Sequence, residues 1–147
     1  MFILIVFWVK SKLLDNGILF DKGMVIISDL TKQSGIDAAK KILKMKPSPD
    51  GVFTSNDTSA VVTIIELVKA GVKIPEEIAV VGFNNEPINQ VVRPDLTTVD
   101  YPAREIGEIA AASLINKLKN SQSANLSTIV LKHNLIIRQS SLKSNKS

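Results

Sequence analysis

The chain has no cysteine and a single histidine among its 147 residues. The lack of cysteine excludes a disulfide framework and a thiolate metal site, and it favours a reducing compartment. No glycine-rich phosphate loop is present, and His133 has no catalytic partner that the sequence identifies. These absences argue against an enzyme. We therefore expect no catalytic residue, no metal site and no cofactor.

Arginine is also scarce, since the 18 basic residues comprise 15 lysines and 3 arginines, and the net charge is +4. The lysines are scattered along the chain, whereas nucleic-acid footprints cluster basic residues and favour arginine. We interpret the charge as a solvated lysine surface rather than a DNA-binding patch.

The N-terminal run Phe2–Val9, FILIVFWV, is entirely apolar. A membrane-spanning helix needs about 20 such residues. A secretory signal places basic residues before its apolar run, whereas Lys10 and Lys12 follow this one. We expect a buried strand, or a start foreign to the rest of the chain, rather than a membrane anchor.

Short apolar runs alternate with helical patterns, which predicts an α/β protein with a doubly wound, mostly parallel sheet covered on both faces. The expected strands are Met24–Ser28, Gly51–Thr54, Ile78–Phe83, Leu96–Val99, Thr128–Leu131 and Asn134–Ile137. The expected helices are Lys32–Lys46, Thr58–Ala70 and Ala103–Lys119, with a further helix ending over Lys10–Asn16. Ser140–Ser147 is predicted to be a frayed polar tail.

Polar residues stand where three of the expected strands end: Asp29, the pair Asn56–Asp57, and the pair Asn84–Asn85. In parallel sheets, ligands bind beyond the carboxyl ends of the strands. Amide and carboxylate groups gathered there can bond the hydroxyls of a small polar ligand. The alternative is that these residues only cap helices and form turns, which they do well.

The expected helix Thr58–Ala70 is apolar over most of its circumference. One face packs on the sheet, and the remaining apolar side chains need another cover. A second subunit is the simplest cover, so we expect a homodimer.

Four stretches of the chain stand out together: SDLTKQSGIDAAKKIL, PDGVFTSNDTSAVVTIIELVKAGVKIPEEIAVVGFNNEPI, RPDLTTVDYPAREIGEIAAASLI and LIIRQSS. In this order and spacing they resemble the effector-binding domain of the lac repressor-type (LacI family) transcription regulators, which share the type I periplasmic-binding-protein fold. The resemblance covers residues 10–141 and leaves 1–9 as an apolar start outside the family pattern and 142–147 as a polar tail. It implies a two-lobed clamshell, of which this chain holds essentially one lobe plus the last helix and strand of the other.

The resemblance also implies particular site residues. Asn56 matches the asparagine that contacts the effector. Asn84 stands where an aspartate is usual, and Leu30 stands where an aromatic ring often stacks on the effector. The candidate effector-binding residues are Asp29, Leu30, Asn56, Asp57 and Asn84. The candidate dimer-interface residues are Val61, Ile65, Pro87, Val91 and Val92.

Two functions compete. The first is the effector-binding and dimerisation part of a cytoplasmic regulator that senses a sugar-like metabolite. The second is a fragment of a periplasmic sugar-binding protein of the same fold. The sequence LTTVDYPAREIG and the lack of a convincing signal peptide favour the first. We expect weak effector binding, no membrane association, and DNA binding only in a full-length regulator, because no helix-turn-helix is evident.

Overall fold

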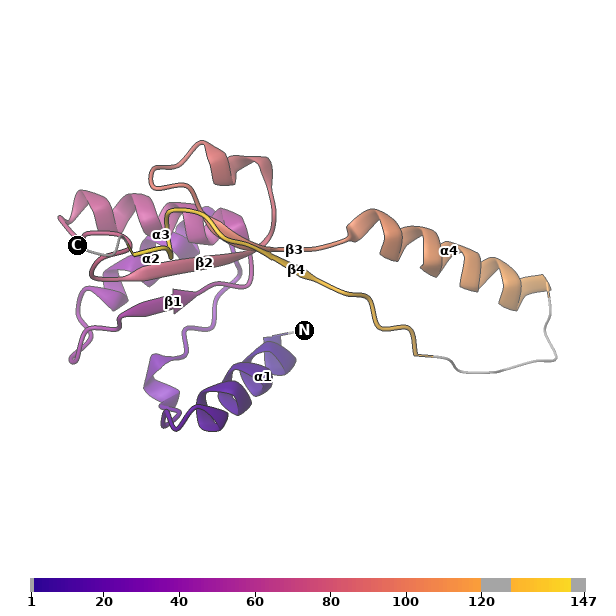
Figure 1. The fold of residues 1–147 in the computed structure, drawn as a ribbon, viewed down its shortest axis with the longest axis horizontal. Helices are drawn as coiled ribbons and strands as arrows, with labels where there is room; N and C mark the ends of the chain where they lie inside the picture. The colour runs from indigo at the N-terminus through magenta and orange to yellow at the C-terminus, as the bar shows by residue number, and fades with distance from the viewer. Residues whose placement is uncertain (1, 120–127, 144–147) are drawn as a thin grey trace.

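A computed structural model describes residues 2–119 and 128–143 of the chain (Figure 1). In chain order the elements are α1 (Phe2–Asp15), η1 (Lys22–Met24), α2 (Lys32–Ile42), β1 (Gly51–Phe53), α3 (Asp57–Lys69), β2 (Ala79–Asn84), η2 (Pro87–Gln90), β3 (Thr97–Asp100), α4 (Ala103–Lys119) and β4 (Asn134–Ile136). The α/β class predicted from the sequence is confirmed.

The sheet has the strand order β1-β2-β3-β4. β1 pairs in parallel with β2, and β2 pairs in parallel with β3, with Phe83 opposite Val99 and Asn84 opposite Asp100. β4 pairs antiparallel with β3. The sheet is therefore mostly parallel, as predicted, and the polar ends of β2 and β3 lie side by side.

Helices α2 and α3 lie together on one face of the sheet (Figure 1). Their fully buried Ala39, Ile64 and Leu67 meet Val80 of β2 in the core. Thr31 caps α2 in a reciprocal capping box with Ser34, which fixes where that helix begins. The opposite face is more open, since Phe53 of β1 is 42% exposed.

Three expected strands differ in the structure. Residues 2–9 belong to helix α1, which continues to Asp15 and ends before Gly17, at a positive φ of 73°. Met24–Ser28 and Thr128–Leu131 are not strands. Apolar runs of this length fit either a strand or a helix, and a strand forms only where another strand supplies its ladder of hydrogen bonds. The described residues supply no such partner to these three segments.

Two boundaries also differ. Helix α2 ends at Ile42, although the apolar pattern predicted that it continues to Lys46. The predicted frayed tail begins with a residue that is fully buried: Ser140 donates to the Val80 carbonyl oxygen at 2.6 Å and accepts from the Thr97 amide at 2.8 Å. Ser140 therefore joins β2 to β3. Residues 144–147 of that tail lie outside the described residues.

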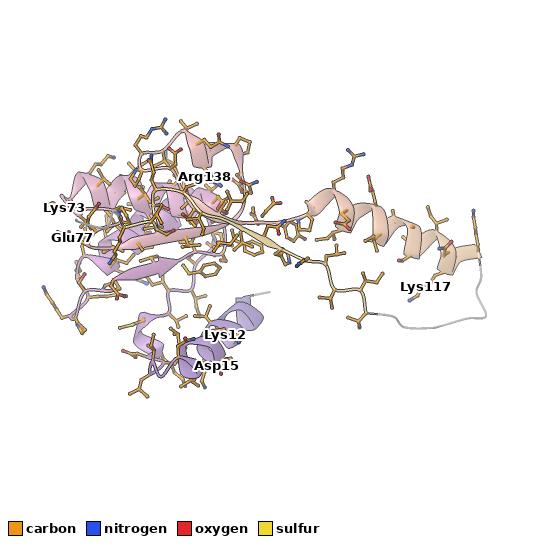
Figure 2. All side chains as sticks on the ribbon, viewed as in Figure 1. Lys12, Asp15, Lys73, Glu77, Lys117 and Arg138 are labelled. Atoms are coloured by element: carbon orange, nitrogen blue, oxygen red, sulfur yellow. The ribbon has the colours of Figure 1, made fainter. Side chains whose placement is uncertain are left out.

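Two regions of the molecule differ in how tightly they are packed. The "body" comprises residues 32–101 with 134–141, and the "arm" comprises residues 102–119 with 128–133. Figure 1 shows α4 pointing away from the sheet, with the chain before β4 returning beside it. Figure 2 shows Lys73 and Glu77 at the end of the body farthest from α4, and Lys117 on the arm. No residue of α4 is buried.

Candidate functional site

Asn56 lies at the carboxyl end of β1, where it caps α3. Its side-chain oxygen accepts from the Ser59 amide at 3.1 Å, which satisfies one of the free N–H groups at the helix start. Its amide nitrogen donates to the Leu30 carbonyl oxygen at 2.9 Å. Asn56 therefore joins the turn after β1 to the turn before α2, while its half-buried side chain stays at the surface.

Asp57, the next residue, is fully buried. One carboxylate oxygen accepts from the Thr98 hydroxyl at 2.7 Å. The other accepts from the Glu86 amide at 2.8 Å and from the Asn89 side-chain amide at 2.7 Å. Gly82 leaves room for this carboxylate, because a Cβ at Gly82 would overlap it. Asp57 thus lies inside the protein, where it joins α3 to the segment after β2, and not at the surface where a ligand would touch it.

Asn84 and Asn85 form the turn at the end of β2 with φ angles of 115° and 56°. Asparagine tolerates this left-handed region better than most residues. The Asn84 side-chain amide donates to Glu86 at 3.4 Å, and the other oxygen of Glu86 accepts from the Thr58 hydroxyl at 3.0 Å. Since Thr58 lies in the first turn of α3, these bonds place the Asn56 and Asn84 turns at the same end of the sheet, as predicted.

The sequence did not predict the contacts that Asn85 makes at the same end of the sheet. The Asn85 side-chain amide donates to Asp100 at 3.1 Å, and its oxygen accepts from Arg138 at 3.1 Å. Arg138, labelled in Figure 2, also donates to the Leu96 carbonyl oxygen at 2.7 Å. The only signal in the sequence was the segment LIIRQSS, which carries no indication of where its arginine lies.

The remaining two predicted residues lie in the turn before α2. Leu30 has a positive φ of 60°, an uncommon conformation for an apolar residue. Asp29 is exposed and lines a hollow of about 300 Å³ against α2, together with Ser34, Asp37 and Lys41. Asp29 thus lies beside α2, and no hydrogen bond among the described residues joins its side chain to Asn56 or Asn84.

Three rings also meet near this end of the sheet. Phe83 ends the apolar part of β2, Tyr101 follows β3, and His133 precedes β4. Each ring centroid lies 5.9–6.1 Å from the other two. The His133 Nδ1 atom lies 3.2 Å from the Asp100 carbonyl oxygen. His133, for which the sequence offered no partner, therefore belongs to an aromatic cluster.

A shallow apolar groove of about 440 Å³ lies in the arm. Ile106, Ile109 and Ala110 of α4 line it on one side, and residues 129–131 with His133 line it on the other. Neither Asn56 nor Asn84 lines it, whereas His133 of the aromatic cluster does. Within residues 2–119 and 128–143, no group of acidic or histidine side chains could hold a metal ion.

The predicted dimer-interface residues fall into two groups. Val61 and Val92 are 3% and 6% exposed and belong to the core, so the expectation that they face a partner is wrong. Ile65 is 39% exposed and Val91 is 77% exposed, and Pro87 is exposed as well. The apolar surface of α3 and η2 that remains available is therefore narrower than the sequence predicted.

Comparison with known proteins agrees with this architecture. Residues 10–141 match the sequence profile described as the periplasmic binding protein-like domain. The NTD biosynthesis operon regulator NtdR of Bacillus subtilis is 40% identical over 74% of this chain, which spans 33% of that protein. Catabolite control protein A of Priestia megaterium is 30% identical over 89% of this chain, which spans 39% of that protein.

A solved structure described as a transcriptional regulator CelR–cellobiose complex superposes with a TM-score of 0.83. It is 27% identical, and the match covers 89% of this chain and 40% of that one. The chain belongs to the periplasmic binding protein-like domain family. Within that family it is similar to the effector-binding domains of lac repressor-type (LacI family) transcription regulators, and it spans well under half the length of these three relatives.

Two further predictions concern catalysis and the membrane. They are transcription regulators and not enzymes, which agrees with the expected absence of catalysis. None of the described helices is long and apolar enough to cross a lipid bilayer.

Proposed function

We propose that this chain is the effector-binding and dimerisation part of a lac repressor-type regulator that senses a small sugar. The observation that carries the proposal is the paired asparagine turns, at Asn56 and Asn84, at one end of a sheet whose fold matches known regulators. The relative solved with cellobiose supports a sugar as the effector. Operator DNA would be bound by the complete regulator, in the cytoplasm.

The polar edge has the chemistry that a neutral sugar requires. The amides of Asn84 and Asn85 supply both donors and acceptors, and the carboxylates of Glu86 and Asp100 accept from hydroxyls. The internal bonds at this edge fix the orientation of these groups before a ligand arrives. Preorganised groups lose less conformational entropy on binding, which favours specificity.

Affinity in the isolated chain should nevertheless be low. The edge is open to solvent in the described structure, whereas a pocket buries about 70–90% of a small ligand. Each exposed hydrogen bond then contributes only about 1 kcal/mol net. We expect dissociation constants for glucose and cellobiose in the millimolar range.

Calorimetric or NMR titration with cellobiose tests the effector site. Asn84→Gly removes the amide while permitting the positive φ, so it should weaken binding without disturbing the turn. Asn16→Ala is the matched control, because the Asn16 side chain bonds Lys12 at the end of α1, outside the body. No detectable cellobiose or glucose binding, or equal affinity of the Asn84→Gly variant, would contradict the sugar-sensing proposal.

The dimer proposal now rests on the exposed Ile65 and Val91. A stable dimer buries about 1,200–2,000 Å² in total. Ile65→Asp and Val91→Asp should therefore shift the sedimentation coefficient towards the monomer without lowering the melting temperature. Ile115→Asp is the matched control, since Ile115 is 50% exposed and belongs to α4, which points away from the sheet and α3 (Figure 1). Dimers that persist in both variants would rule out this surface.

A further inference from the structure

The aromatic cluster of Phe83, Tyr101 and His133 lies partly at the surface of the molecule. Tyr101 and His133 are nearly parallel, with a 15° angle between their rings and 6.1 Å between centroids. Phe83 is tilted by 48–49° to both. Tyr101 is 39% exposed and His133 is exposed too, so the cluster presents ring surface to solvent.

The cluster adjoins the polar edge through the backbone. Phe83 immediately precedes Asn84 on β2, and Tyr101 immediately follows Asp100, which accepts from the Asn85 side-chain amide at 3.1 Å. The His133 ring is held 3.2 Å from the Asp100 carbonyl oxygen. The rings and the hydrogen-bonding amides thus both occur at the carboxyl ends of β2 and β3.

The combination of a flat ring surface and fixed amides suits a pyranose. A pyranose carries hydroxyls around its rim, which bond amides and carboxylates, and C–H groups on its faces, which pack on an aromatic ring. Ligand sites in general join apolar and aromatic surface to a few oriented polar groups. The turn before α2 holds Leu30 and supplies no ring, whereas the aromatic cluster supplies three.

We propose that Phe83, Tyr101 and His133 form a stacking subsite for one face of the effector's sugar ring. The subsite deepens the proposed function and rests on it. Tyr101 carries the main test, because it is the larger of the two exposed rings of the cluster.

Saturation-transfer NMR of the whole chain with cellobiose tests the subsite. The ring C–H protons of one face should show the strongest transfer, and Tyr101→Ala should weaken cellobiose binding about fivefold. Tyr101→Phe keeps the ring and should bind within about twofold of the original chain. Phe53→Ala is the matched control, since Phe53 is 42% exposed on the sheet but lies outside the cluster.

His133→Ala provides an independent variant, and it should also weaken binding because His133 stacks on Tyr101. Far-ultraviolet circular dichroism of each variant checks that the fold is retained. Undiminished affinity in both Tyr101→Ala and His133→Ala, with Asn84→Gly still impaired, would overturn the subsite and leave the sugar site standing. A complete lack of cellobiose and glucose binding by the original chain would overturn both.

Discussion

The body and the arm carry similar apolar patterns but bury them to different degrees. In α3 of the body, Ala60, Ile64 and Leu67 are fully buried. In α4 of the arm, Leu114 and Leu118 are 59% and 75% exposed. Both helices were predicted within one residue of their observed ends. Periodicity therefore locates a helix and its apolar stripe, but it does not say whether anything covers the stripe.

The same contrast holds for polar groups. The ion pair Arg104–Glu108 of α4 spans 2.9 Å, with both side chains more than half exposed. Asp57 of the body is fully buried and accepts three hydrogen bonds. Exposed pairs contribute little because water and salt screen them. A buried carboxylate with several donors holds its neighbours in place, since removing it leaves each donor without a partner. The two regions should therefore respond very differently to the same substitution.

Removal of the two carboxylates gives the largest expected difference. Asp57→Ala should lower the free energy of unfolding by about 4 kcal/mol, because three buried donors lose their acceptor. Glu108→Ala on the arm should change it by less than about 0.5 kcal/mol. Urea unfolding followed by circular dichroism measures both. Equal losses from the two variants would show that the arm is as tightly packed as the body.

The next largest difference compares two leucines. Leu67→Ala removes a fully buried side chain and should cost about 3 kcal/mol through lost burial and the cavity left behind. Leu114→Ala, at a position 59% exposed, should cost less than about 0.5 kcal/mol. The same urea titrations report both values. A loss above about 2 kcal/mol for Leu114→Ala would mean that α4 is covered in solution, for example by another copy of the chain.

The body is also the region that the sequence predicted well. Strands β1, β2 and β3 have local apolar runs and neighbours close in the sequence, so pattern and turn residues were sufficient. Phe2–Val9 and Thr128–Leu131 have equally strong apolar character, yet one is a helix and the other has no regular structure. A strand depends on a partner that local sequence does not contain, which is why these predictions were wrong.

At the candidate site, sequence position predicted the right edge but not the role of each residue. Asn56 and Asn84 lie there as expected, whereas their neighbour Asp57 faces inward because α3 begins with it. Arg138 reaches Asn85 from 53 positions away in the chain, and Tyr101 and His133 stack although one precedes α4 and the other follows it. Such long-range contacts depend on the tertiary fold, and no spacing rule in a single sequence reveals them.

The smallest expected difference in stability between the body and the arm comes from one glycine in a helix of each region. In α2, a Cβ on Gly35 would lie 2.8 Å from both the Ser59 carbonyl oxygen and the Val62 Cβ. In α4, a Cβ on Gly107 would meet nothing within 4 Å. Alanine favours a helix over glycine by about 0.8–1.0 kcal/mol, so the same substitution gains helix propensity at both sites and meets a steric clash at only one.

Gly35→Ala should therefore destabilise the body by about 2 kcal/mol, because two closely packed helices must separate to admit the methyl group. Gly107→Ala should raise the helical circular dichroism of the arm. The free energy of unfolding of the body, measured by urea titration, should change by less than about 0.5 kcal/mol. Hydrogen exchange distinguishes the regions directly, since α4 amides should be more protected in Gly107→Ala and α3 amides should not change. Stabilisation of α3 by Gly107→Ala would demonstrate that arm and body unfold as one cooperative unit, so their different packing in the structure would not reflect separate stabilities.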